Sequence, residues 1–164
     1  MINKKLTLKD ARRIRDKYWK KVTDKQSREF HLLHSESIST TIILLAKDRH
    51  VDINILKIAA LVHDIGYSVR KETHPLHSVE ILEKEGYILS DKLKDCILNH
   101  STGSSPKTVE GKLFQTADKA DIFNPVIISV IAKYNKKNIK DGDLKFLESV
   151  SAKAIGLLKE YNLG

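Results

Sequence analysis

Apolar residues recur at spacings of three and four along most of this chain, which is the period of an amphipathic helix. One such row, Ile38, Ile42 and Leu45, continues upstream to His34 at the same spacing. Loop-forming residues separate the periodic segments, as in the stretch STGSSP at 101–106. The pattern predicts helices over residues 6–22, 27–48, 54–62, 74–85, 91–100, 108–122 and 125–135, and a last helix that ends near residue 161. We therefore expect an all-α fold, a single compact bundle of about seven or eight helices.

Residues at the ends of these segments are typical of helix caps. Thr7 and Ser90 can each accept a hydrogen bond from the first turn of the helix that follows. Pro75 suits the first turn of the helix at 74–85, and Gly86 follows the last residue of that helix. Gly66 comes after the third helix, where we expect a left-handed backbone conformation.

Length and composition narrow the class of protein. The 164 residues suit one domain over 1–164, with a motif-bearing core of about 27–125 and terminal helices packed on it. Aromatic residues make up only 6%, so aliphatic side chains must build the core, which favours helices over a β-sandwich or barrel. The only cysteine, Cys96, excludes an internal disulfide and a thiolate zinc cluster, and we expect it to be inert. No run approaches the ~18 apolar residues of a membrane span, so we expect a cytoplasmic protein with no membrane partner.

The formal net charge is +8, but Lys and Arg are spread over the whole length with Asp and Glu among them. This distribution does not imply nucleic-acid binding. The positive field either attracts a small phosphorylated substrate or serves only solubility, and composition leaves both open.

The dipeptide His63-Asp64 carries the most informative chemistry, because it closes the apolar run 58–62. An imidazole and a carboxylate at the end of a buried helix cost free energy unless something compensates them, and a divalent cation does so directly. Three other predicted helices each carry a further candidate ligand on an apolar row, namely His34, His100 and Asp118. Residues far apart in the sequence are therefore expected to meet at one metal site.

Five segments repeat a known combination of motifs: His34-Ser35, AALVHDIG at 59–66, HPLHSVEIL at 74–82, NHSTG at 99–103 and ADKAD at 117–121. Together they resemble the HD-domain superfamily of metal-dependent phosphohydrolases, in the type with the sequence His-Asp-Ile-Gly. The resemblance covers roughly residues 30–125 and implies an all-α HD-domain bundle.

The resemblance implies one divalent cation bound by four side chains, those of His34, His63, Asp64 and Asp118. It implies a second cation at His74 and His100, with the carboxylate of Asp64 shared between the ions. Sites rich in nitrogen ligands suit Mn, Fe, Co, Ni or Zn better than Mg. Two such ions activate water for attack on phosphorus and bind phosphate oxygens.

Further roles follow from the same resemblance. Asp64 and Asp121 are expected to be catalytic. Asp121, one helical turn after Asp118, is expected either to orient a water or a ligand or simply to form a structural pair. The residues expected to face the substrate are Lys119, Arg70, Lys71, His77 and Thr102. His77 also competes with His74 as the ligand on that helix. His31 and His50 are interpreted as ordinary surface or partly buried residues.

Motifs of individual branches of the superfamily disfavour some substrates without identifying one. Guanosine tetraphosphate hydrolases of the superfamily carry an acidic pair after His-Asp, whereas this chain has IGYS at 65–68, and the Gly-Tyr-Pro motif of cyclic di-GMP phosphodiesterases is missing. The stretch 100–103 is similar to the His-Thr-Thr-Gly of bacterial diadenosine tetraphosphate hydrolases. A small phosphomonoester, a nucleotide or a dinucleotide therefore remains possible.

Two other functions stay open: a di-iron oxygenase on the same scaffold, and a non-catalytic nucleotide sensor. The oligomeric state, monomer or homodimer, also stays open. A final apolar stripe fits the core better than a dimer interface; it comprises Leu144, Leu147, Val150, Ala154 and Leu158.

Overall fold

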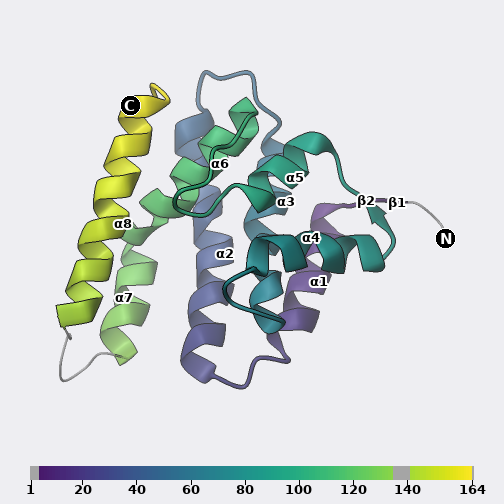
Figure 1. The fold of residues 1–164 in the computed structure, drawn as a ribbon, viewed down its shortest axis with the longest axis horizontal. Coiled ribbons are helices and arrows are strands. Elements are labelled where there is room, and N and C mark those ends of the chain that lie inside the picture. Colours follow the sequence, from purple (N-terminus) through teal and green to yellow (C-terminus); the bar gives the residue numbers. More distant parts are fainter. Residues whose placement is uncertain (1–3, 135–140, 164) are drawn as a thin grey trace.

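A computed structural model describes residues 4–134 and 141–163 and confirms the all-α fold (Figure 1). The described residues form eight α-helices: α1 (Leu8–Trp19), α2 (Lys25–Ala46), α3 (Ile53–Val62), α4 (His74–Lys84), α5 (Asp91–Leu98), α6 (Val109–Ala120), α7 (Pro125–Tyr134) and α8 (Asp141–Glu160). Two short 3₁₀ helices, η1 (Ile65–Ser68) and η2 (Asp121–Phe123), follow α3 and α6. Two strands of two residues each, β1 (Lys4–Lys5) and β2 (Tyr87–Ile88), pair in parallel and were not anticipated from the sequence.

Helix ends lie within a few residues of the predicted positions, and the caps explain the differences. Thr7 accepts a hydrogen bond from Asp10 N at 3.2 Å, as its sequence position predicted, and Ser90 caps α5 in the same way. The second helix begins at Lys25 instead of residue 27 because Asp24 caps it, accepting from Ser27 N at 2.8 Å. The predicted end of the seventh helix at residue 135 lies outside the described residues.

The third helix, α3, occupies the centre of the bundle. It packs against α1, α2, α5 and α6, and six of its ten residues are buried. Burying an aliphatic side chain contributes roughly 1.5–3 kcal/mol, so these contacts fix the helix firmly. Because His63 caps the C-terminal end of α3, it is only 1% exposed.

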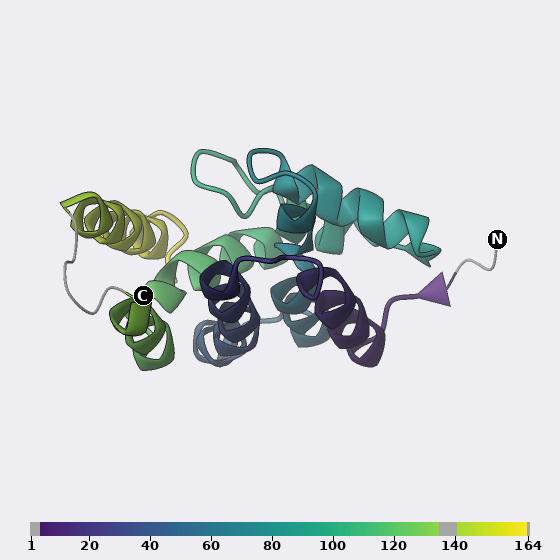
Figure 2. The same cartoon turned by 90° about the horizontal axis from the view of Figure 1, so that it is seen from below.

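The last two helices form one side of the molecule. Helix α7 packs on α2, and α8 packs on α6, at the end opposite to β1 and β2 (Figures 1 and 2). On α8, Ala154 and Leu157 are buried, whereas Leu144 is 46% exposed. Of the predicted apolar stripe, Ala154 is therefore the buried member, while Leu147, Val150 and Leu158 are partly buried. None of the described helices is both long and apolar enough to cross a membrane.

Candidate metal centre

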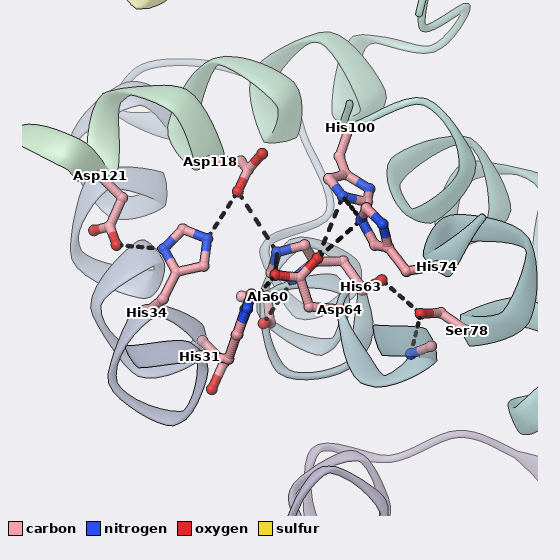
Figure 3. Close-up of polar contacts among 12 residues, drawn as sticks. His31, His34, Ala60, His63, Asp64, His74, Ser78, His100, Asp118 and Asp121 are labelled. Atoms are coloured by element: carbon pink, nitrogen blue, oxygen red, sulfur yellow. Dashed lines mark hydrogen bonds and ion pairs between the residues drawn. The ribbon is translucent and has the colours of Figure 1, made fainter. Parts of the chain in front are cut away.

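Six predicted ligands from separate parts of the chain meet in one buried cluster (Figure 3). They are His34 on α2, His63 and Asp64 after α3, His74 on α4, His100 after α5 and Asp118 on α6. A cavity of about 270 Å³ opens beside them and is lined by all of these except His63. The cluster has two ends, which differ in their chemistry and are joined by His63 and Asp64.

One end, called the aspartate end, consists of His34, Asp118 and Asp121. The His34 ring bonds with both carboxylates: Nε2 lies 2.9 Å from Asp118 Oδ1, and Nδ1 lies 2.8 Å from Asp121 Oδ2. Ser37 Oγ also donates to Asp121 at 2.5 Å. Burial disfavours the charged imidazole, but the hydrogen bonds to Asp118 and Asp121 raise the pKa of His34 to about 9.

The other end, called the histidine end, consists of His74 and His100. Their Nδ1 atoms each lie 2.7 Å from a backbone carbonyl, Lys71 O and Ile97 O respectively. If each Nδ1–H donates to its carbonyl, both Nε2 atoms carry a lone pair, and these atoms are only 2.9 Å apart. Asp64 Oδ1 lies 3.2 Å from His74 Nε2 and 3.4 Å from His100 Nε2. Burial lowers the pKa of His100, so its ring favours the neutral form.

Between the two ends, the His63 ring is held in the same way as the rings of His74 and His100, with Nδ1 near a backbone carbonyl. Its Nδ1 lies 3.1 Å from Ala60 O, while its fully buried Nε2 makes no hydrogen bond with any residue that the structure describes. That Nε2 faces Asp64 Oδ2 at 3.3 Å and Asp118 Oδ1 at 3.5 Å. Burial opposes charge on this ring, but the Asp64 carboxylate raises the pKa of His63 to about 10. A positive charge is therefore favoured at this position.

The donor set fits a divalent transition metal. Imidazole nitrogens held by backbone carbonyls and ionised carboxylates are the ligands such ions bind, and the carbonyls fix each ring in the required tautomer. Two sets of three ligand atoms lie within 4.8 Å of one another, one from His34, His63 and Asp118 and one from His63, Asp64 and His100. In the ion-free arrangement, protons on the rings supply the positive charge that a cation supplies when it binds.

The two carboxylates are held in the ionised form that metal binding needs. Burial would raise the pKa of Asp118, but the Lys119 ammonium and the hydrogen bond from His34 hold it well below the usual value. The Lys119 Nζ lies 2.5 Å from Asp118 Oδ2. Burial acts on Asp64 in the same way, and the charge of His63 keeps its pKa well below normal.

His31, interpreted from the sequence as an ordinary residue, lies in the cluster instead. Its Nδ1 lies 2.9 Å from Asp64 Oδ2, and its ring stacks on Trp19 with centroids 4.5 Å apart. The sequence does contain a signal: His31 precedes His34 by three residues, so both rings project from the same side of α2. The ring also packs against Tyr67, which lines the cavity, with centroids 4.6 Å apart.

The turn after His63 requires a glycine, but for a different reason than the sequence suggested. Gly66 does not have a positive φ, unlike Gly86 and Gly103. A Cβ on Gly66 would lie 2.0 Å from the His74 carbonyl oxygen, so glycine allows η1 to pack directly on α4. Ser78 Oγ completes this contact by donating to His63 O at 2.6 Å and accepting from Gly66 N at 2.9 Å.

The residues expected to face a substrate divide into two groups. Lys119 and Thr102 line the cavity. Arg70 and Lys71 do not line it: both are exposed on the loop that leads out from η1, where Arg70 pairs with Glu72. His77 also lies outside the lining, and its Nδ1 lies 2.9 Å from Glu80 Oε2 instead.

Comparisons with known proteins agree with this geometry. The model of the HD domain family matches residues 32–122, which is more than half of the chain. A deoxyguanosinetriphosphate triphosphohydrolase-like protein of Caldanaerobacter subterraneus subsp. tengcongensis is 30% identical over 118 residues, covering 60% of this chain and 34% of the relative. Ribonuclease Y of Clostridium perfringens is 29% identical over 134 residues, 79% of this chain and 25% of the relative.

Ribonuclease Y of Desulfotalea psychrophila is 28% identical over 133 residues, again 79% of this chain and 24% of the relative. This chain thus spans about a third or less of the length of these curated relatives. No solved structure gives a significant match.

Proposed function

Since the chain belongs to the HD domain family, we propose that it is a metal-dependent phosphohydrolase that cleaves a small phosphate ester with activated water. The observation that carries this proposal is the convergence of imidazole nitrogens and carboxylates, the groups that bind divalent transition metals. Three Nε2 atoms and the carboxylates of Asp64 and Asp118 face one another in a buried space beside a cavity. Such a cluster is costly without positive charge and suits divalent cations.

A bound divalent cation lowers the pKa of water and binds phosphate oxygens, which neutralises the charge that develops during displacement at phosphorus. The chain's residues orient this chemistry. Asp64 directs Oδ2 toward His63 and Oδ1 toward the histidine end, so it is the candidate ligand shared between two ions. Asp121 holds His34 with Nε2 toward Asp118, which is the positioning role that the sequence left open.

Residues that line the cavity provide contacts for the phosphate. Lys119 places an ammonium group there, although it already pairs with Asp118. The Thr102 side chain lies at the exposed edge of the same cavity and can donate a hydrogen bond to a phosphate oxygen. These contacts add to charge neutralisation without requiring Arg70 or Lys71.

The relatives support a substrate with a bond to phosphorus. One is named as a deoxyguanosinetriphosphate triphosphohydrolase-like protein and the others as Ribonuclease Y. Both names denote cleavage of bonds between phosphorus and oxygen. We therefore propose a small phosphorylated substrate, with nucleotides in the test panel.

The experiment is a hydrolysis panel of phosphate esters and nucleotides, with and without Mn²⁺, Co²⁺ or Ni²⁺. We expect turnover that depends on the added metal and is lost in Asp64→Asn, because the amide cannot serve as a shared anionic ligand. Asp48→Asn, an exposed residue at the end of α2, is the matched control and should retain full activity.

Two results would contradict the proposal. Metal binding without hydrolysis of any phosphorylated compound would favour a nucleotide sensor. Bound iron together with oxygen consumption would favour a di-iron oxygenase.

A further inference from the structure

The cavity has a second kind of lining that the metal cluster does not use. Beside the ionisable groups, the lining includes four apolar side chains, those of Phe30, Ile122, Ile127 and Val150. Ile127 and Val150 come from α7 and α8, which pack on α2 and α6 (Figure 1) and also contact η2, the element that begins at Asp121 of the aspartate end. One region of the cavity is therefore apolar and next to His34 and Asp118.

Most of this apolar region lies outside the part of the chain that the family shares. The family match covers residues 32–122, so it includes the six candidate ligands but leaves out Phe30, Ile127 and Val150. Ile127 is 1% exposed and Val150 is partly buried, so both are held by packing. The segments that surround the family match therefore supply most of this apolar lining.

The charge in the cavity limits how many phosphates it can hold. Among the described lining residues, Lys119 is the only Lys or Arg, and its ammonium already bonds with Asp118 at 2.5 Å. Each additional phosphate adds negative charge that must be neutralised by further cations or donors. The described lining residues therefore favour a single phosphate group.

The size of the cavity limits the remainder of the substrate. Its volume is about 270 Å³. Pockets for drug-sized ligands range from about 300 to 1,000 Å³. A phosphate with one small ring or a short apolar group therefore fills this cavity, whereas much of a dinucleotide would extend outside it.

Building on the proposed phosphohydrolase function, we infer that the substrate is a monophosphate ester of a compact apolar or aromatic alcohol. The phosphate faces the metal ligands, and the alcohol part packs on Phe30, Ile127 and Val150. Dispersion contacts and burial of apolar surface bind the alcohol part of the substrate. These side chains offer no polar group that could form a hydrogen bond with it.

The test compares phenyl phosphate, glycerol 3-phosphate and ATP as substrates of the metal-loaded protein. We expect kcat/KM to be at least about tenfold higher for phenyl phosphate than for either of the others. Efficient hydrolysis of ATP or glycerol 3-phosphate in preference would overturn this inference and leave the proposed function standing. Absence of metal-dependent hydrolysis of every ester would contradict both.

A matched pair of variants tests the apolar contact itself. Val150→Asn should lower kcat/KM for phenyl phosphate about tenfold and leave glycerol 3-phosphate nearly unchanged, because it places an amide against the apolar alcohol. Val126→Asn makes the same change at a position of α7 that is 45% exposed and does not line the cavity, and should alter neither substrate. Equal effects of the two variants, or equal losses on both substrates, would show that Val150 does not contact the alcohol.

Discussion

The aspartate end and the histidine end of the cluster differ in the groups that bond with their histidine rings, and therefore in how buried charge is compensated. At the aspartate end, His34 bonds with two carboxylates, so its positive charge is compensated within the protein. At the histidine end, His74 and His100 bond with backbone carbonyls through Nδ1 and bring their Nε2 atoms within 2.9 Å of each other. We expect the first end to persist with a proton in place of a metal ion. The second end, where two Nε2 atoms and Asp64 Oδ1 face one another, should gain more from a bound cation. This difference predicts unequal responses to mutation and pH.

Removing a metal ligand should have the largest effect. His100→Ala is expected to leave one ion per chain and to reduce turnover more than about 100-fold, since loss of a ligand exceeds the 10- to 100-fold cost of losing an outer partner. Metal content by mass spectrometry, together with phosphate release, measures both effects. Asp64→Asn, which alters the residue common to both ends, should lose both ions. Retention of both ions in His100→Ala would remove the distinction between the ends.

Gly66→Ala should disturb the histidine end through the backbone. The new Cβ would lie 2.0 Å from His74 O and 2.7 Å from Ser78 N, so α4 must move away from η1. We expect a loss of about 3 kcal/mol in the free energy of unfolding, measured by urea denaturation. Gly156→Ala on α8 is the control, because its Cβ meets nothing within 4 Å and alanine favours a helix. Equal stabilities of the two variants would contradict the close packing of η1 on α4.

Variants of His31 test how Asp64, which joins the two ends, is held in position. His31→Phe keeps a ring against Trp19 but loses the hydrogen bond to Asp64, so Mn²⁺ affinity should fall about 10- to 100-fold. His31→Asn, whose amide can donate in the same direction, should recover most of the affinity. Calorimetry measures the affinity, and fluorescence of Trp19, the single tryptophan, reports the local change.

The exposed His50 provides the control for that experiment, and His50→Phe should bind Mn²⁺ like the wild type. If His31→Asn were as weak as His31→Phe, His31 would be a metal ligand itself and not a positioning residue.

The smallest expected effect is a pH dependence that distinguishes the metal-free from the metal-loaded protein. His34 and His63 have pKa values raised to about 9 and about 10, so their charged forms stabilise the metal-free fold. This stabilisation is complete below the ordinary pKa of about 6.5 and is lost as the pH rises through 9 and 10. The Tm in EDTA should therefore fall by a few degrees between pH 6.5 and 9.

With Mn²⁺ the trend should reverse, because metal binding requires unprotonated rings and strengthens as protons leave. Thermal unfolding in EDTA and in Mn²⁺ across this pH range gives the comparison. Parallel curves would contradict the exchange of protons for metal at the aspartate end.

Much of the cluster follows from local sequence, and the remainder depends on contacts between distant segments. Helical spacing placed His34 and Asp118 on buried faces, and both lie there. The same reasoning could not orient the rings, because the carbonyls and carboxylates that bond with them belong to the folded structure. His31 was missed because its meaning depends on Asp64, which lies 33 residues away.

The paired strands and the reason for Gly66 were missed on similar grounds. Lys4 pairs with Tyr87, which is far away in the sequence. A strand of two residues is also too short to give a periodic signal. The close approach of η1 to α4 likewise has no local signature beyond the glycine itself.

The central claim is that the acceptor cluster binds divalent cations, and metal content tests it most directly. Protein purified without chelator, beside Asp64→Asn prepared in the same way, should be measured by mass spectrometry before and after dialysis against Mn²⁺. The account predicts about two ions per chain in the wild type and none in the variant. A wild-type protein that emerges without metal and takes up no Mn²⁺ would contradict it.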